Sequence, residues 1–158
     1  MSLIENLTRD YGDFKIEIPN WELADKGITV LWGPSGAGKT SVFRLLIGLE
    51  PCPRLKWNFQ GMNLAEVPIT KRRLGVVFQN YELFPHMSAK ENILFAAEAR
   101  NIENSEEKLK DLVNSLQLQD CINTKSSKLS GGEQQRTALA RALIGEPRFY
   151  FKMNLFLI

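Results

Sequence analysis

Hydrophobic and polar residues alternate near the start of the chain, where charged residues separate Phe14, Ile16 and Ile18. This period of two is typical of a β-strand with one buried face. We expect the strand to end at Pro19, because proline cannot donate to a strand ladder. A nearly continuous apolar run follows at 28–32. Such runs are typical of central parallel strands covered on both faces, so a buried strand is predicted there.

Two further short apolar segments predict strands, at 74–78 and, after Pro147, at 149–151. Turn-forming residues at 25–27 are expected to separate the first two strands. The pattern between residues 51 and 68 is weak, with prolines and scattered aromatics. Loops and short pieces of structure are expected in that part of the chain.

Apolar residues spaced three and four apart predict helices. One covers 41–47, and another covers about 90–100 with Ser88 as its N-cap. A third begins at Ser105, and a fourth covers 132–144. The positions expected to face a core are Ile93, Phe95, Ala96 and Ala97 in the second helix and Leu109, Leu112, Val113 and Leu116 in the third.

The composition narrows the class of protein. The chain has 158 residues, of which 44% are hydrophobic, and its net charge is +2 with acids and bases interleaved. This balance does not favour a nucleic-acid partner, which needs a basic face. Cys52 and Cys121 have no metal-ligand spacing and are expected to be reduced thiols. No run approaches the roughly 20 apolar residues that span a bilayer, and no signal peptide is visible, so a cytoplasmic protein is expected.

A candidate phosphate-binding loop, the P-loop, follows the 28–32 run. It matches the pattern G-x-x-x-x-G-K-[ST] with Gly33, Pro34, Ser35, Gly36, Ala37, Gly38, Lys39 and Thr40. Glycines let successive amides point at phosphate oxygens, and the positive end of the helix that continues with Ser41 strengthens the site. Lys39 is expected to reach the β- and γ-phosphates, and the Thr40 hydroxyl to ligate Mg²⁺. A glycine turn with no ligand is the alternative. Kinases, GTPases and transport ATPases all carry this loop.

A second motif spans 129–136 and reads Leu-Ser-Gly-Gly-Glu-Gln-Gln-Arg. A Ser-Gly-Gly turn that opens a helix is another anion-binding terminus, formed here by Ser130, Gly131 and Gly132. One triphosphate does not need two such sites, so the second is expected to serve the nucleotide of another subunit. The motif resembles the Leu-Ser-Gly-Gly-Gln signature of ABC transporter ATP-binding subunits, with Glu133 where that consensus has glutamine.

The resemblance implies roles for further residues. Tyr11 stands where the family has the aromatic residue that stacks on adenine. Gln79 matches the glutamine that approaches Mg²⁺ and the attacking water. Residues 79–88 match the region that meets the membrane subunit, and they look most like importers of small anions, metals, polyamines or sugars. His86 is not the family's switch histidine, and we interpret it as a surface or interface residue without a metal role.

The resemblance also implies the fold. It is the α/β fold of P-loop ATPases, with a mostly parallel core sheet, an N-terminal antiparallel part and a helical subdomain, here incomplete at its C-terminal end. We expect one partial domain. Residues 1–80 would form the ATP-binding core, 81–130 the helical subdomain and signature, and 131–151 the return to the core.

The family pattern breaks after Phe151. The family continues there with Asp-Glu-Pro, whose aspartate supports Mg²⁺ and whose glutamate polarises the attacking water. Residues 152–158 contain no carboxylate. A shift of one base, with codons chosen freely, would restore Asp-Glu-Pro-Phe, so we interpret 152–158 as an out-of-frame tail. A genuine short form is the alternative. Without that glutamate, hydrolysis is expected to be about 10²–10⁴-fold slower, and the chain is expected to be poorly soluble or partly folded.

The resemblance implies an energy-coupling ATPase subunit of an importer, with ATP and Mg²⁺ as its ligands. Two such domains meet head to tail, each next to a permease subunit, and a solute-binding protein takes part indirectly. The protein is therefore expected on the inner face of the membrane. The alternatives are a non-catalytic or non-functional fragment and a soluble non-transport ABC protein. A P-loop kinase would leave the Ser130 motif unexplained.

Overall fold

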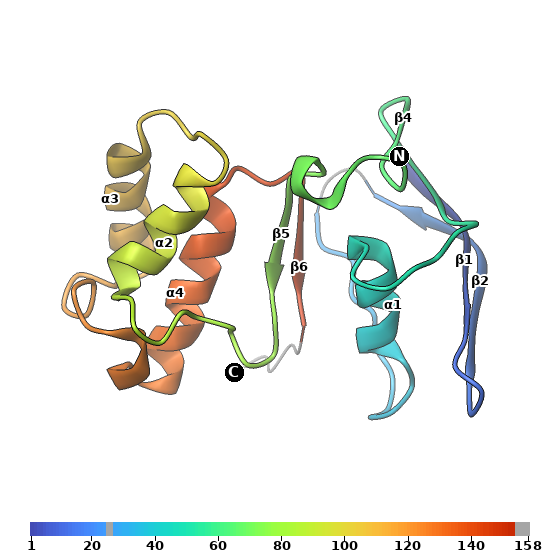
Figure 1. The fold of residues 1–158 in the computed structure, drawn as a ribbon, viewed down its shortest axis with the longest axis horizontal. Coiled ribbons are helices and arrows are strands. Elements are labelled where there is room, and N and C mark those ends of the chain that lie inside the picture. Colours follow the sequence, from blue (N-terminus) through green and yellow to red (C-terminus); the bar gives the residue numbers. More distant parts are fainter. Residues whose placement is uncertain (25–26, 154–158) are drawn as a thin grey trace. The chain divides into compact units, whose positions relative to one another are not determined.

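A computed structural model describes residues 1–24 and 27–153 of the chain (Figure 1). It divides into two compact units, Met1–Arg72 and Arg73–Ile158, and each is considered by itself. Residues 25–26 of the predicted turn and residues 154–158 of the predicted tail lie outside the described residues.

The first unit is built on a four-stranded antiparallel sheet in the order β2-β1-β3-β4. The strands are β1 Ser2–Asp10, β2 Lys15–Leu23, β3 Lys56–Phe59 and β4 Met62–Asn63. Strand β2 starts one residue after Phe14 and continues past Pro19, with Asn20 paired to Glu5. Proline is tolerated because β2 lies at the edge of the sheet. The pairing with β1 skips Pro19 and the opposite residue Asn6, whose φ is 56°. The predicted strand is therefore confirmed, but its predicted end is wrong.

Helix α1, Lys39–Ile47, completes the first unit together with a short 3₁₀ helix at Ile69–Lys71. It ends at Gly48, whose φ of 86° suits a glycine C-cap. Its buried face consists of Val42, Leu45, Leu46 and Ile47. From β3, the indole of Trp57 is fully buried and donates to the Ser2 hydroxyl at 2.7 Å. The apolar faces of the helix and the sheet thus supply the core of this unit.

The strand predicted at 28–32 is not formed. Ile28 and Trp32 are each 90% exposed, and Val30 is 53% exposed. A parallel strand needs backbone partners, and the segment belongs to neither of the two sheets found among the described residues. An apolar run favours a strand only where neighbouring strands and covering helices bury it. The prediction of a buried central strand is therefore wrong for this structure.

The second unit combines a parallel strand pair with three helices that Figure 1 shows side by side. Its elements are β5 Leu74–Val77, α2 Ala89–Glu98, α3 Ser105–Ser115, a 3₁₀ helix at Ser126–Lys128, α4 Gly131–Ile144 and β6 Phe149–Lys152. Each predicted helix and both predicted strands are present within a few residues. The mixed α/β class, with antiparallel and parallel sheets, is confirmed.

One apolar cluster lies between the three helices of the second unit. Its buried members are Ala89, Ile93, Ala97, Leu109, Leu118, Cys121, Leu129, Ala140 and Ile144. Phe95 was expected to face the core, but it is 46% exposed. The fully buried Asn92 instead joins α2 to its surroundings, because its amide donates to the Ser126 hydroxyl at 2.7 Å and accepts from the Phe84 amide at 2.8 Å.

Candidate nucleotide-binding site

Two glycines shape the P-loop. Gly36 and Gly38 have φ values of 83° and 82°, in the left-handed region that other residues enter only at a cost. The loop turns at 33–38, with the amide of Ala37 donating to the carbonyl of Pro34 at 3.3 Å. Helix α1 begins directly afterwards at Lys39. Gly38, a fixed position of the motif, therefore has a backbone conformation that favours glycine, and so does Gly36 at a variable position, whereas Gly33 has no left-handed φ.

The start of α1 is suited to an anion. Within the described residues no side chain caps it, and its first turn contains no acidic residue. The first amides of a helix have no partner inside the helix, and the helix dipole makes that end positive. Ser35 and Thr40 are exposed, and Ser41 is half-buried. The donors of this turn are thus open to a phosphate group.

Lys39 supplies a positive charge at the same place. Its ammonium group donates to the carbonyls of Gly33 at 2.8 Å and Pro34 at 2.6 Å, so the side chain folds back over the loop. Both acceptors are neutral carbonyls, so they leave the positive charge of Lys39 for an incoming anion.

Tyr11 lies beside the P-loop. Its hydroxyl donates to a carboxylate oxygen of Glu50 at 2.5 Å, and its ring stacks on Phe14 with 4.6 Å between centroids. Partial burial raises the pKa of Tyr11, and so does its hydrogen bond to Glu50, while the hydroxyl of Ser41 acts in the opposite direction. The interaction with Ser41 connects this aromatic pair to the first turn of α1.

Phe14 and Glu50 are site neighbours that the sequence analysis did not identify. A side chain at Gly38 would meet the Phe14 ring at 3.3 Å, so Phe14 packs against the loop. The pKa of Glu50 lies below its usual range because the Tyr11 hydroxyl and Arg44 both donate to it. Phe14 follows Tyr11 closely enough to suggest an aromatic pair, whereas no local pattern indicates Glu50.

The Ser130 turn is a capped helix start, unlike that of α1. Ser130 is the N-cap of α4, and its backbone amide and its hydroxyl each donate to the same carboxylate oxygen of Glu133 at 2.7 Å. These two hydrogen bonds lower the pKa of Glu133. Gly131 and Gly132 are exposed, as a turn that contacts another subunit needs, but the Ser130 hydroxyl is held by Glu133.

Gln79 lies in an exposed turn directly after β5. It belongs to the second unit with the Ser130 turn, whereas Tyr11 and the P-loop belong to the first. Tyr11, Phe14 and the P-loop therefore lie close together in the first unit. Gln79 and Ser130 belong to the second unit, and neither is placed relative to the P-loop. His86 is exposed, with its ring 6.3 Å from that of Phe84.

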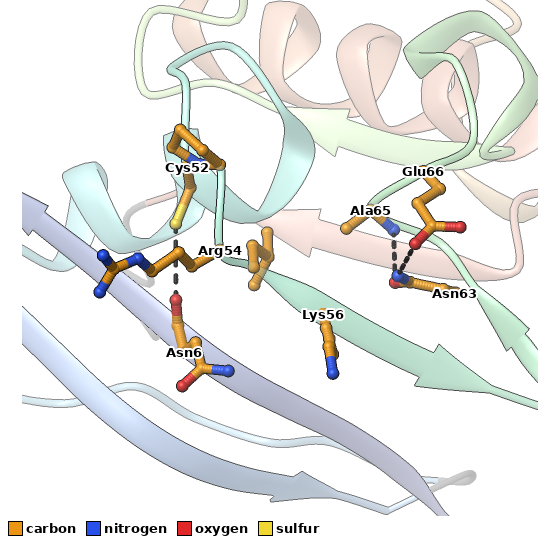
Figure 2. A pocket seen from close by; sticks show the side chains of 9 residues that line it. Asn6, Cys52, Arg54, Lys56, Asn63, Ala65 and Glu66 are labelled. Carbon is orange, nitrogen blue, oxygen red and sulfur yellow. Dashed lines mark hydrogen bonds between the residues drawn. The ribbon is translucent and has the colours of Figure 1, made fainter.

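Outside the P-loop, the described residues hold a pocket but no metal-binding cluster. Across 1–24 and 27–153, no three side chains of His, Cys, Asp or Glu form a metal-binding group. A pocket of about 500 Å³ lies between β1 and the segment before β3, lined by residues that include Asn6, Cys52 and Glu66 (Figure 2). None of the P-loop residues lines it, so it is separate from the candidate nucleotide site. No helix in the described part of the chain could cross a bilayer.

The residues fit a triphosphate with its metal ion. The open helix start, the folded-back Lys39 and the left-handed glycines provide donors and positive charge for phosphate oxygens. The exposed hydroxyl of Thr40 offers one ligand for Mg²⁺, an ion that takes few protein ligands beside water and phosphate oxygens. An α/β fold with such a loop defines a nucleotide-binding protein of the P-loop class.

A model of the ABC transporter family matches residues 16–151, a range that includes the P-loop, Gln79 and the Ser130 turn. The match covers most of the chain. The protein therefore belongs to the ABC transporter family, and the resemblance drawn from its two phosphate-binding motifs is confirmed.

Curated relatives with similar sequences are ATP-binding proteins of importers. The sulfate/thiosulfate import ATP-binding protein CysA of Nephroselmis olivacea is 39% identical over 149 residues, which cover 92% of this chain and 43% of that protein. The spermidine/putrescine import ATP-binding protein PotA of Haemophilus influenzae is 39% identical over 153 residues, covering 92% of this chain and 40% of that protein. The chain thus spans about two-fifths of the length of these relatives.

Solved structures have the same fold. An ATP-binding subunit of an ABC transporter superposes with a TM-score of 0.81 at 23% identity, covering 99% of this chain and 67% of that chain. The ATP-binding cassette MJ0796, in a dimeric post-hydrolysis state bound to ADP and Pi, gives 0.79 at 25% identity, covering 96% and 73%. These comparisons establish the fold of the chain.

Proposed function

We propose that this chain is the ATP-binding part of an importer's energy-coupling subunit, and that it binds ATP with Mg²⁺ at the P-loop. The observation that carries the proposal is the uncapped start of α1, where the Lys39 side chain folds back over the P-loop. The residues proposed to hold the phosphates are Gly33, Pro34, Ser35, Gly36, Ala37, Gly38, Lys39, Thr40 and Ser41. Mg²⁺ neutralises charge on the β- and γ-phosphates when it is bound. In this chain Thr40 and Gln79 would hold it.

Tyr11 is proposed to stack on the adenine base. Its ring stacks on Phe14, which packs against Gly38 just before α1. An aromatic face gives a base an apolar surface without demanding sequence-specific hydrogen bonds. The pair formed with Phe14 keeps the ring in place. The Tyr11 hydroxyl is occupied by Glu50 and one ring face by Phe14, so the other face is the part proposed for the base. The Arg9 guanidinium lies 5.8 Å from the ring centroid and would have to leave room for that base.

The remaining proposed contacts are with other proteins. Ser130, Gly131 and Gly132 would complete the nucleotide site of a second copy in a head-to-tail dimer, and a relative of the same fold is dimeric. Residues 79–88 would meet a membrane-spanning permease subunit, which would hold the chain at the inner face of the membrane. A solute-binding protein would act through that permease. Similarity to CysA and PotA favours a small anion or a polyamine as cargo.

A second candidate function is nucleotide binding without rapid turnover. The family's water-polarising glutamate should follow the strand that corresponds to β6, and residues 152–158 contain no carboxylate. A general base is typically worth about 10²–10⁴-fold in rate. Phosphate release measured beside ATP binding separates the two functions, because binding with no measurable release favours the second.

Lys39→Ala tests the nucleotide site. Removal of the ammonium group should weaken Mg²⁺-ATP binding at least about tenfold, measured by isothermal titration calorimetry, because charge-assisted contacts to phosphate typically contribute 1.5–3 kcal/mol, or roughly tenfold and more. Lys15→Ala is the matched control, since Lys15 is exposed on β2 and pairs with Glu17. Circular dichroism verifies that both variants are folded. Equal affinity in Lys39→Ala and in the unmodified chain would overturn the proposal.

A further inference from the structure

A strained turn follows Gln79. Tyr81 and Glu82 are consecutive non-glycine residues with φ values of 61° and 48°. The left-handed conformation costs roughly 1–2 kcal/mol for each such residue, because Cβ approaches the carbonyl oxygen. Local hydrogen bonds close the turn, from the Tyr81 amide to the Phe78 carbonyl at 3.0 Å and from the Glu82 amide to the Asn80 carbonyl at 2.7 Å. The chain therefore keeps a conformation that its residue types oppose.

Arg141 of α4 holds the two carbonyls of this turn. Its Nη1 donates to the carbonyl of Glu82 at 2.7 Å, and its Nη2 donates to the carbonyl of Tyr81 at 2.8 Å. The planar guanidinium group offers two donors at a fixed separation, which matches two successive carbonyls. The same group lies 5.8 Å from the centroid of the Phe84 ring. One side chain thus contacts residues that lie about 60 positions earlier in the chain.

Most of the loop is exposed, although Tyr81 is half-buried and Leu83 packs against the apolar cluster of the second unit. Gln79, Asn80 and Glu82 are exposed, as are Pro85 and His86 further along the loop. Strained backbone on an exposed loop persists only where its surroundings determine it, and such strain is concentrated at functional sites. Arg141 is half-buried and donates to main-chain oxygens of this loop. Its contacts therefore depend on the backbone shape of the loop, which indicates that this shape is what the arginine maintains.

The other end of the same helix carries the Ser130 turn. Helix α4 runs without interruption from Gly131 to Ile144, and Arg141 lies in its last turns. A continuous ladder of backbone hydrogen bonds makes the helix one element from end to end. The side chain of Arg141 therefore links the loop after Gln79 to the element that begins at the Ser-Gly-Gly turn.

We propose that Arg141 is a positioning residue, which fixes the Tyr81–Glu82 turn and so gives residues 79–88 one defined shape for docking. The identity of the docked partner, a membrane-spanning permease subunit, rests on the proposed function. The role of Arg141 in fixing the turn is independent of the proposed function. A lysine at position 141 would keep the charge but could hold only one carbonyl well, so the proposal requires the guanidinium fork itself.

Hydrogen exchange tests this proposal on the full chain at low concentration. In Arg141→Lys, a peptide covering residues 79–88 should exchange at least about tenfold faster, while the helix Ala89–Glu98 keeps its protection. Arg73→Lys is the matched control, because Arg73 is exposed on the same unit and its ion pair with Glu146 spans 3.7 Å. The control should leave the exchange of 79–88 unchanged.

A second substitution distinguishes positioning from simple attachment of the loop. Glycine adopts positive φ without strain, so adding Glu82→Gly to Arg141→Lys should restore at least half of the lost protection. If Arg141 only attaches the loop to α4, glycine at 82 would give no rescue, and the proposal would be wrong. Unchanged exchange in Arg141→Lys would also overturn it. Mg²⁺-ATP affinity, measured on the same samples, reports separately on the proposed function.

Discussion

At the scale of single residues, Gly75 shows how closely the second unit is packed. It lies in β5, and a Cβ atom built on it would be 2.9 Å from Cγ of Pro147 and 3.0 Å from the carbonyl oxygen of Ala142. Both neighbours are rigid, one a proline ring and the other the backbone of α4. Glycine is therefore required here for the approach of the helix to the strand, and its backbone conformation is ordinary.

Gly75→Ala should consequently destabilise the second unit. Overpacking against atoms that cannot move typically costs about 1–3 kcal/mol, which urea denaturation of the purified variant would measure. Gly131→Ala is the control, because no atom lies within 4 Å of a Cβ at that position and alanine favours a helix. If Gly75→Ala and the control had equal free energies of unfolding, the prediction would be wrong, because β5 and α4 could then move apart to admit the methyl group without loss of stability.

The residues predictable from the sequence are those whose role is decided by neighbours in the chain. Ser88 as an N-cap and Gly38 in the P-loop follow from spacing alone, and the structure has the serine cap and a left-handed φ at that glycine. Glu50 and Arg141 could not be found in this way. Their partners lie tens of residues away, at Tyr11 and at the Tyr81–Glu82 turn, so only the folded chain brings them together.

At the scale of elements, α2 and α4 begin in the same way. Each has a serine N-cap that accepts from the amide of a glutamate three residues on, while the carboxylate of that glutamate accepts from the serine amide. The amide and hydroxyl of Ser88 lower the pKa of Glu91, and those of Ser130 lower the pKa of Glu133. Both helices are therefore stabilised by ionised glutamates at their positive ends.

These shifts predict a dependence of stability on pH. A carboxyl with a lower pKa in the folded state contributes stability above its unfolded pKa, about 4.3 for glutamate, and loses it as the pH falls through the folded value. A variant with both Glu91→Gln and Glu133→Gln should lose less stability on acidification than the unmodified chain. Urea unfolding followed by circular dichroism along a pH series would measure this.

Glu107→Gln is the control for the pH series, because Glu107 lies in the first turn of α3, whose N-cap makes no side-chain hydrogen bond in the described structure. Its acid sensitivity should match that of the unmodified chain. Equal acid sensitivity of the double variant and this control would mean that the capping carboxylates do not contribute to stability in the way proposed.

Elements were predictable where their stabilising contacts are local, and this limit is clearest in the strands. The helices follow from caps and apolar spacing. The apolar runs predicted β5 and β6, and that prediction holds because the two strands, distant in sequence, pair with each other in parallel. The segment 28–32 has an equally strong pattern but pairs with no strand of the two described sheets. Its burial depends on partners that the pattern of the segment itself does not specify.

At the scale of the whole molecule, the 28–32 segment exposes an unusual amount of apolar surface beside the P-loop. Ile28 and Trp32 are each 90% exposed, while most apolar side chains of α1 are buried. Exposed apolar patches commonly mediate association, and unpaired backbone next to them can join strands of other chains. The two units otherwise have their own cores, so this segment is the part of the surface where self-association would begin.

We therefore expect the purified chain to self-associate through 28–32 as its concentration rises. A variant with Ile28→Lys and Trp32→Lys should remain a monomer, measured by sedimentation velocity over a concentration series. Met62→Lys with Ile69→Lys is the control, because these side chains are 44% and 47% exposed and the two variants gain the same charge. The control should associate like the unmodified chain. If both double variants prevent association equally, their added charge is the cause and not the loss of the 28–32 apolar surface. If the unmodified chain stays monomeric at high concentration, the segment does not mediate association.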